Sequence, residues 1–325
     1  GHYGKARLEA KEQGVSALGY VIEMALLGQA QVKTLANKSN VQWFTPNHIV
    51  DINWHGAVKE STLNPPKGNV QTDNIVVTLD SKQVLQTSLL LACDGANSPC
   101  RQLAKITSRE NDYQQVALIA NVATKKSHNN KAFERFTESG PLAMLPLSQL
   151  NGENRCSLVW TMTPEQSNDI SALSDDEFKS KLENAFGSWL GAITAVGKRD
   201  TYPLILLQAE QQTYHRMALI GNASHTIHPI AGQGFNLGLR DVQQMSIQVQ
   251  KSLQTNQDIG SFAVLNEYAQ QRKIDQQQVI ELTDSLVTLF ANDLIPLIAG
   301  RNIGLKVMNY VSPLKNALVN KLMGY

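Results

Sequence analysis

Residues 216–241 constrain the fold of this chain more strongly than any other stretch. The stretch begins with an apolar run at 217–220, which is long enough for a buried strand. Pro229 excludes a helical conformation for the residue before it, while Gly232 and Gly234 permit a tight turn and the close approach of a ligand. Apolar residues then return at the spacing of one helix face, at Leu237, Val242, Met245 and Val249. The stretch therefore predicts a strand, a Gly/Pro loop and the start of a helix.

This order of elements is typical of a ligand site. Open α/β sheets bind ligands beyond the carboxyl ends of their strands. A helix N-terminus presents free N–H groups and a partial positive charge. We therefore expect the loop after residue 220 to face an anionic ligand, or one that becomes anionic during turnover. An ordinary strand–turn–helix crossover without a ligand is the alternative.

A second stretch of the same kind, residues 94–101, follows another apolar run. It reads Asp-Gly-Ala-Asn-Ser-Pro-Cys-Arg. Ser98 is a favourable N-cap residue, and Pro99 suits the first position of a helix. This local chemistry accounts for Ser98 and Pro99 but leaves Asp94 and Arg101 without a role of their own.

Together the two stretches resemble the flavin motifs of the FAD-dependent aromatic hydroxylases, the para-hydroxybenzoate hydroxylase-like monooxygenases. Residues 94–101 match the family's D-G-x-x-S-x-x-R motif. Residues 221–236 follow its Gly-Asp, His-Pro and Gly-x-Gly-x-Asn elements in the same order, with Asn222 at the Asp position. The resemblance implies an FAD site in which His228 and Pro229 form a flavin-facing loop, with no catalytic side chain assigned. The implied FAD-binding residues are Asp94, Gly95, Arg101, Gly221, Asn222, Pro229, Gly232, Gln233, Gly234 and Asn236.

One position departs from the wider family, which has Asp where this chain has Asn222. An Asn side chain still accepts a hydrogen bond from a ribityl hydroxyl, and it adds two donors. Only the negative charge is lost. We therefore expect FAD binding to survive this difference.

Further segments resemble the bacterial ubiquinone-biosynthesis hydroxylases within that family. These segments are 119–124, 133–137, 140–146, 156–160, 283–287 and 300–305. The resemblance implies a cytoplasmic monooxygenase that uses NAD(P)H and O2 and hydroxylates a polyprenylated phenol through reduced FAD and a C4a-hydroperoxide. Two alternatives stay open: a sister hydroxylase of different regiochemistry, and a non-catalytic fragment or assembly subunit.

The expected fold is α/β, or α+β overall: an incomplete Rossmann-like FAD-binding domain with an inserted β-sheet substrate domain and a C-terminal helical region. Residues 1–104 are assigned to the remainder of the FAD-binding domain, with 1–20, expected to form short strands and turns, joining the substrate sheet. Residues 105–208 form the substrate domain, 209–291 the second part of the FAD-binding domain, and 292–325 a helical tail. The expected strands are 41–50, 75–79, 84–92, 116–122, 132–136, 142–147, 156–162 and 201–207, and a turn lies at 64–69. The expected helices are 20–37, 175–190 and 261–291. Ser174 suits the N-cap of the helix at 175–190, with Glu177 three residues on.

One motif of such enzymes is missing. A dinucleotide-binding domain opens with a strand and G-x-G-x-x-G, and Gly14 and Gly19 do not supply it. We expect the absent unit to span on the order of 80–100 residues, the size of one dinucleotide-binding half. The chain by itself is then expected to bind FAD poorly and to be inactive.

Composition excludes several other classes of protein. The net charge of +1 gives no basic excess for nucleic acid. The three cysteines form no C-x-x-C pair, and without a signal peptide they favour a reducing cytosol. No apolar run reaches the length of a membrane span.

Two features leave smaller questions. His225 and His228 have a spacing that hints at a metal, but no Cys or carboxylate ligand lies beside them, so we expect none. The apolar tail after residue 292 has three interpretations. Intramolecular packing ranks first, contact with a protein complex of ubiquinone biosynthesis second, and peripheral membrane contact third.

Overall fold

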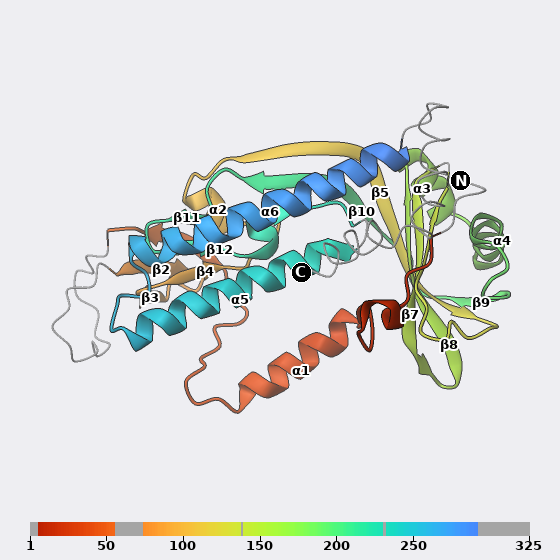
Figure 1. Cartoon of the computed structure of the whole chain (residues 1–325). Helices are drawn as coiled ribbons and strands as arrows, with labels where there is room; N and C mark the ends of the chain where they lie inside the picture. The colour runs from red at the N-terminus through yellow and green to blue at the C-terminus, as the bar shows by residue number, and fades with distance from the viewer. Residues whose placement is uncertain (1–5, 56–73, 138, 230–231, 292–325) are drawn as a thin grey trace. The chain divides into compact units, whose positions relative to one another are not determined.

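The computed structural model describes residues 6–55, 74–137, 139–229 and 232–291. The chain divides into two compact units (Figure 1). The first comprises 1–41, 113–204 and 285–325, and the second comprises 42–112 and 205–284. The division into four segments expected from the sequence stays a prediction. None of the described helices is long and apolar enough to cross a lipid bilayer.

A small sheet in the second unit places the two sequence motifs. Its strand order is β11 (Thr213–Tyr214), β12 (Met217–Leu219), β4 (Leu90–Ala92). β12 and β4 are parallel, with Leu219 opposite Ala92. Both strands therefore end at the same edge of the sheet, although more than a hundred residues separate them. The motif stretches 94–101 and 221–236 start at this edge.

Two long helices pack on this sheet. They are α5 (Gln233–Gln254) and α6 (Phe262–Ala291), and they run side by side (Figure 1). The predicted helices beyond residue 236 and over 261–291 are thereby confirmed. Their shared core with the sheet consists of Ala218, Ile220, Met245, Leu265 and Tyr268. The hydroxyl of Tyr268 donates to the carbonyl oxygen of Leu219 at 3.0 Å, which fixes α6 against β12.

A second sheet of this unit is an antiparallel meander of β1 (Ile49–Asn53), β2 (Ile75–Leu79) and β3 (Val84–Thr87). The strand expected at 41–50 is wrong, because the chain pairs only from Ile49 and Pro46 offers no N–H to a ladder. The expected strand 84–92 is two strands, β3 and β4. The carbonyl oxygen of Ser88 between them accepts a hydrogen bond from Arg216 instead of from a strand. The turn expected at 64–69 lies outside the described residues.

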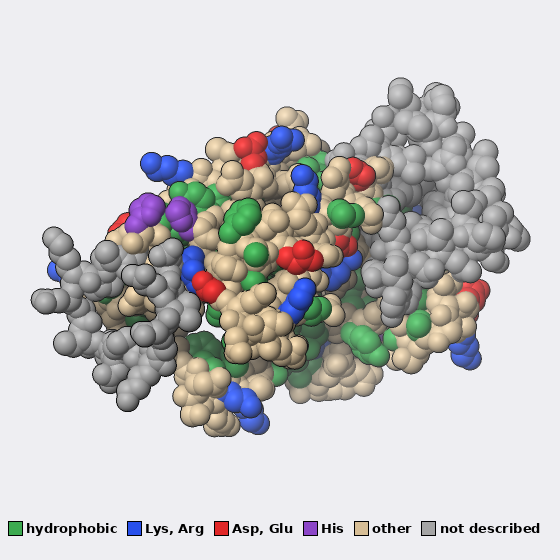
Figure 2. Space-filling model, turned by 60° about the vertical axis from the view of Figure 1, so that its left-hand side comes forward, with side chains coloured by type: hydrophobic (Ala, Val, Ile, Leu, Met, Phe, Trp, Pro, Cys, Tyr) green, Lys and Arg blue, Asp and Glu red, His purple; other side chains and the backbone are tan. Residues whose placement is uncertain are grey.

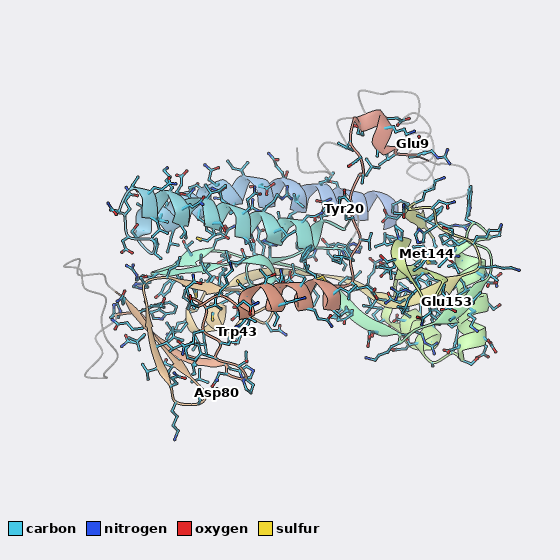
Figure 3. All side chains as sticks on the ribbon, turned by 90° about the horizontal axis from the view of Figure 1, so that it is seen from below. Glu9, Tyr20, Trp43, Asp80, Met144 and Glu153 are labelled. Atoms are coloured by element: carbon cyan, nitrogen blue, oxygen red, sulfur yellow. The ribbon has the colours of Figure 1, made fainter. Side chains whose placement is uncertain are left out.

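The first unit is built on a long antiparallel sheet. β5 (Ser108–Thr124), which begins in the second unit, pairs with β8 (Glu153–Met162), which pairs with β7 (Pro141–Leu150), which pairs with β6 (Phe133–Phe136). β9 (Ile193–Val196) also pairs with β5. β10 (Asp200–Ala209) runs into the second unit, where its end pairs with β13 (His225–Thr226). Met144 and Glu153 mark β7 and β8 in Figure 3.

Two helices cover one face of this sheet. They are α3 (Pro164–Ser171) and α4 (Asp175–Phe186), and both begin with a capping box. The Ser174 cap with Glu177 was predicted and is confirmed. The core beneath the helices includes Leu118, Leu142, Leu158, Trp160, Ile170, Phe178 and Leu182.

The N-terminal region differs from the prediction. Described residues 6–20 contain one short 3-10 helix, Ala10–Gln13, and no strand, so the short strands expected there are wrong for this part of the chain. No residue of that helix is buried, so this segment has no core contacts that would hold a strand against a sheet. The helix expected at 20–37 is confirmed as α1 (Met24–Ala36). Its N-cap residue Glu23 is held by Arg155 at 2.7 Å.

Candidate cofactor site

Arg101 connects the two motif stretches. Its guanidinium donates from Nη1 to the carbonyl oxygen of Ala223 at 2.8 Å and from Nη2 to that of Ala96 at 2.7 Å. The side chain is only 5% exposed. The first motif therefore holds the turn of the second in place, a contact across 122 positions of sequence. Direct contact of Arg101 with a cofactor stays a prediction.

The remainder of the first motif is a tightly capped turn. Ser98 Oγ accepts from the backbone N–H of Arg101 at 2.9 Å, which confirms the predicted N-cap of α2 (Pro99–Leu103). Asp94 Oδ2 accepts from the N–H of Cys100 at 3.0 Å. Gly95 has φ +85°, a conformation that favours glycine. Burial and the hydrogen bond with Asp94 raise the pKa of the Cys100 thiol to about 12, so this cysteine stays protonated.

The turn after β12 approaches α5 closely. Gly221 has φ +59°, and a Cβ atom on Gly238 would lie 3.4 Å from its Cα. Asn222 follows in the one-turn 3-10 helix Gly221–Ala223, with its side chain exposed. Gly238 was missed by the sequence analysis. A glycine within an otherwise regular helical pattern is the signal that points to close backbone contact.

The start of α5 has the properties expected of an anion-binding helix end. Gly232 is its N-cap residue with φ +63°, and no side chain caps it. Gln233 is buried and Gly234 follows in the first turn. The amide of Asn236 donates to the carbonyl oxygen of Gly232 at 3.4 Å, so the exposed Asn236 braces the turn. N–H groups at such an end carry a partial positive charge.

A buried carboxylate supports the same turn from behind. Asp241 of α5 is fully buried, and its Oδ2 accepts from the N–H of Gly221 at 2.8 Å and from Nε2 of His225 at 2.7 Å. Its Oδ1 accepts from Nε of Arg272 at 2.6 Å and from the amide of Gln276 at 3.2 Å. Burial opposes ionisation, but His225 and Arg272 outweigh it and hold the pKa of Asp241 below its ordinary value.

Asp241 and Arg272 were not singled out by the sequence analysis. A charged residue among the buried positions of an amphipathic helix was the available signal for Asp241. His225 is committed to this carboxylate. Among the described residues, no group of three or more His, Cys, Asp or Glu side chains is arranged to hold a metal ion.

His228 lies in the loop between this turn and α5. It is almost fully buried, and burial lowers the pKa of its imidazole to about 4. The side chain is therefore neutral at neutral pH. Pro229, which follows it, is half-buried, and its carbonyl oxygen accepts from the N–H of Gly232 at 2.9 Å.

This shift predicts acid sensitivity. Between pH 6.5 and about 4 the unfolded chain protonates His228 while the folded chain does not, so the free energy of unfolding falls as the pH falls. The loss is absent above pH 6.5, is complete below pH 4 and amounts to about 3 kcal/mol. Urea unfolding at several pH values should show a shallower fall for His228→Gln. Equal pH dependence of the two proteins would contradict the assignment.

Several buried polar atoms near the turn fit a polar ligand. Ser224 Oγ, His225 Nδ1 and Thr226 Oγ1 are buried and have no hydrogen-bond partner among the described residues. Around Gly232 no described atom lies within 4 Å of the position of a Cβ atom, so the backbone there is open to close approach. An FAD molecule, with its ribityl hydroxyls and phosphates, matches this set of donors, acceptors and glycine turns.

The parallel strands β4 and β12 end at one edge of the sheet, where two glycine turns and the uncapped start of α5 follow them. This arrangement defines an α/β unit that binds a nucleotide cofactor. The chain matches the FAD binding domain family over residues 57–283, more than half its length. It belongs to the FAD-dependent monooxygenases of this family. Its cofactor is FAD, and NAD(P)H is the typical reductant of the family.

Individual relatives agree with this assignment. The chain is 32% identical to ubiquinone hydroxylase UbiL of Rhodospirillum rubrum over 323 residues, which is 99% of this chain and 69% of the relative. It is 29% identical to 3-demethoxyubiquinol 3-hydroxylase of Escherichia coli over 97% of this chain and 75% of the relative. The structure of OxyS anhydrotetracycline hydroxylase from Streptomyces rimosus has the same fold (TM-score 0.62, 16% identity), covering 94% of this chain and 57% of that chain.

The exposed position of Asn222 in the turn predicts how two substitutions at this residue differ in their effect on FAD affinity. Asn222→Asp in the intact protein should leave FAD affinity within about threefold, because the side chain still accepts a hydrogen bond. Asn222→Leu should weaken FAD binding by about 1–3 kcal/mol, since a ribityl hydroxyl then loses its partner. Titration followed by flavin fluorescence measures both. An unchanged affinity for the Leu variant would rule out direct contact.

Proposed function

We propose that the protein hydroxylates a polyprenylated phenol in ubiquinone biosynthesis, using FAD, NAD(P)H and O2. The observation that carries the proposal is the β4–β12 parallel pair, which brings both flavin motifs to one edge, where Arg101 ties them together. The names of the two relatives supply the substrate class. Within the ubiquinone-biosynthesis hydroxylases, the sequence most resembles enzymes that act on 2-octaprenyl-6-methoxyphenol. We propose this compound as the first substrate to test.

The residues of the site have separate tasks in this proposal. FAD, when bound, activates O2 for transfer of one oxygen atom to an electron-rich ring. Asn222 would hold the ribityl chain. The N–H groups that follow Gly232 in the first turn of α5 would stabilise negative charge on the bound flavin, since the N–H of Gly232 itself donates to Pro229. Pro229 and the neutral His228 wall the flavin and keep water away. Asp94, Gly95 and Arg101 position the turn near the ribityl chain and pyrophosphate.

The sheet of the first unit supports an apolar aromatic substrate. Alternate residues of β5, β7 and β8 pack under α3 and α4, so the intervening residues belong to the opposite face. That second face carries the small or apolar, half-buried side chains of Ile119, Ala143, Leu145, Ser157 and Val159, together with the exposed, polar Asn121. We therefore propose that 105–208 forms the substrate domain.

On the face in Figure 2, the described residues form no basic patch for a polyanionic substrate. On the face in Figure 2, the described Lys and Arg side chains are spread singly among Asp and Glu side chains. Such a distribution does not focus a strong field of one sign. We propose a prenylated phenol, rather than nucleic acid, as the partner molecule. Contact with a ubiquinone-biosynthesis complex or with a membrane surface is a further proposal, which concerns the tail at 292–325.

The test is a reaction with defined products. The intact protein, FAD, NADH or NADPH, and O2 are incubated with prenylated phenols that differ in the open ring position. Mass spectrometry should detect a product one oxygen atom heavier, formed with matching consumption of reductant. Product from a different open position would support the sister hydroxylase, which the name of the Escherichia coli relative favours. A colourless protein that releases no flavin on denaturation would favour the non-catalytic alternative.

A further inference from the structure

We propose that Asp241 and Arg272 are a positioning pair for the cofactor, in which the carboxylate fixes the Gly221–Asn222 turn and the guanidinium keeps that carboxylate charged. The inference rests on the proposed function, because it concerns the same FAD site. It adds α6, which carries Arg272 and lies outside both motifs, to the elements that set FAD affinity.

The geometry leaves Asp241 no spare capacity. Its two oxygens accept hydrogen bonds from four donors: the backbone N–H of Gly221, His225, Arg272 and Gln276. A carboxylate offers about four acceptor positions, so this one is saturated. The orientation of the carboxylate is therefore determined from both helices, and it determines where the N–H of Gly221 lies.

The buried charge needs Arg272. A buried carboxylate without a counter-charge is strongly unfavourable. Arg272 is 5% exposed and is itself held: Nη1 donates to Asp275 at 2.5 Å and Nη2 to the carbonyl oxygen of Leu237 at 3.4 Å. Arg240 of α5 contacts the other oxygen of Asp275 at 3.0 Å. A layer of alternating charges thus locks Arg272 in place behind Asp241.

The pair acts on the residues that the cofactor would touch. Gly221 immediately precedes Asn222, and His225 lies three residues beyond it. The close approach of Gly221 to Gly238 presses the same turn against α5, so a shift of the carboxylate would move the turn as a whole. A displacement of about 1 Å can cost about a hundredfold in a reaction that depends on the alignment of its groups. We therefore expect the hydrogen bonds between this turn and the cofactor to depend on the carboxylate.

A matched ion pair in the same unit separates positioning from general stability. Arg216 is also buried, and it contacts Asp258 and the carbonyl oxygen of Ser88. Neither of these contacts involves a residue of the cofactor turn. Arg216→Gln should therefore lower the melting temperature of the apoprotein and leave the FAD dissociation constant within about twofold.

The experiment compares Asp241→Asn, Arg272→Gln and the double variant in the intact protein. An Asn at 241 must direct its N–H2 group at other donors, so FAD binding should weaken about ten- to a hundredfold. Arg272→Gln leaves the carboxylate without its counter-charge and should weaken binding to a similar extent. In the double variant, the Asn oxygen can accept from Gly221 and His225, while its N–H2 group donates to the amide oxygen introduced at position 272 or to that of Gln276. The FAD affinity of the double variant should then recover to within about threefold of that of the parent protein.

FAD affinity and apoprotein melting temperature are measured separately for each protein, at a temperature where all are folded. The rescue by the double variant, together with unchanged affinity in Arg216→Gln, supports positioning. Unchanged FAD affinity in Asp241→Asn, or a double variant no better than the singles, would overturn it. If Asp241→Asn does not fold, Arg272→Lys decides, because it should retain affinity that Arg272→Gln loses. A parent protein that binds no FAD would instead refute the proposed function itself.

Discussion

Gly232→Val in the intact protein is expected to abolish retention of FAD. Gly232 has φ +63° at the N-cap of α5, a conformation that a β-branched residue adopts only with strain. Its surroundings are open, with no described atom within 4 Å of a Cβ position, so the folded chain loses no packing. The effect falls on the turn and on the approach of the isoalloxazine. We expect FAD affinity to drop by more than about a hundredfold, or about 3 kcal/mol.

Matched variants show where that effect originates. Gly152 in the β7–β8 hairpin also has positive φ (+80°) and open space, so Gly152→Val carries the same backbone strain and should keep FAD. Gly234→Val should abolish FAD retention as well. A Cβ on Gly234 would make only an ordinary contact, 3.7 Å from Ile227, so we attribute the expected effect to the cofactor. Stoichiometric FAD after purification of Gly232→Val would place the flavin loop elsewhere.

Gly260→Ala is expected to destabilise the second unit by about 3 kcal/mol, the upper end of the usual cost of overpacking. A Cβ at this position would lie 1.9 Å from the carbonyl oxygen of Ser88, and within 2.9 Å of two nitrogens of Arg216. The backbone of Ser88 cannot move without breaking its hydrogen bond to Arg216, which also contacts Asp258. The methyl group therefore disrupts the contact that Arg216 makes between the β3–β4 junction and the segment before α6.

Urea unfolding of the apoprotein measures this effect. Gly28→Ala in the middle of α1 is the control, since nothing lies within 4 Å of its Cβ position. That change should stabilise α1 by about 0.5–1 kcal/mol, the helix preference of Ala over Gly. An unfolding midpoint for Gly260→Ala equal to that of the parent would contradict the close packing at Ser88.

The sequence was sufficient wherever short-range chemistry determines structure. The caps at Ser98 and Ser174 were predictable, because each hydrogen bond joins residues three positions apart. The strand–loop–helix order of 216–241 followed from its apolar spacing and its glycines. The missed helix α3 had a signal of the same kind, the Thr163–Gln166 capping box with Pro164. The prediction of a strand at 41–50 was wrong because it rested on apolar residues and did not account for Pro46, which has no N–H for strand pairing.

What the sequence by itself determined is thus the local elements, the flavin motifs and, through them, the family. The tertiary structure alone decided which distant groups meet. The parallel pairing of β4 with β12, the contact of Arg101 with Ala223 and the contact of Asp241 with Arg272 join segments far apart in the chain. No periodicity or short motif encodes such pairs, because they depend on how two sheet strands and two helices pack. The donors and acceptors that face one another are fixed only once that packing has formed.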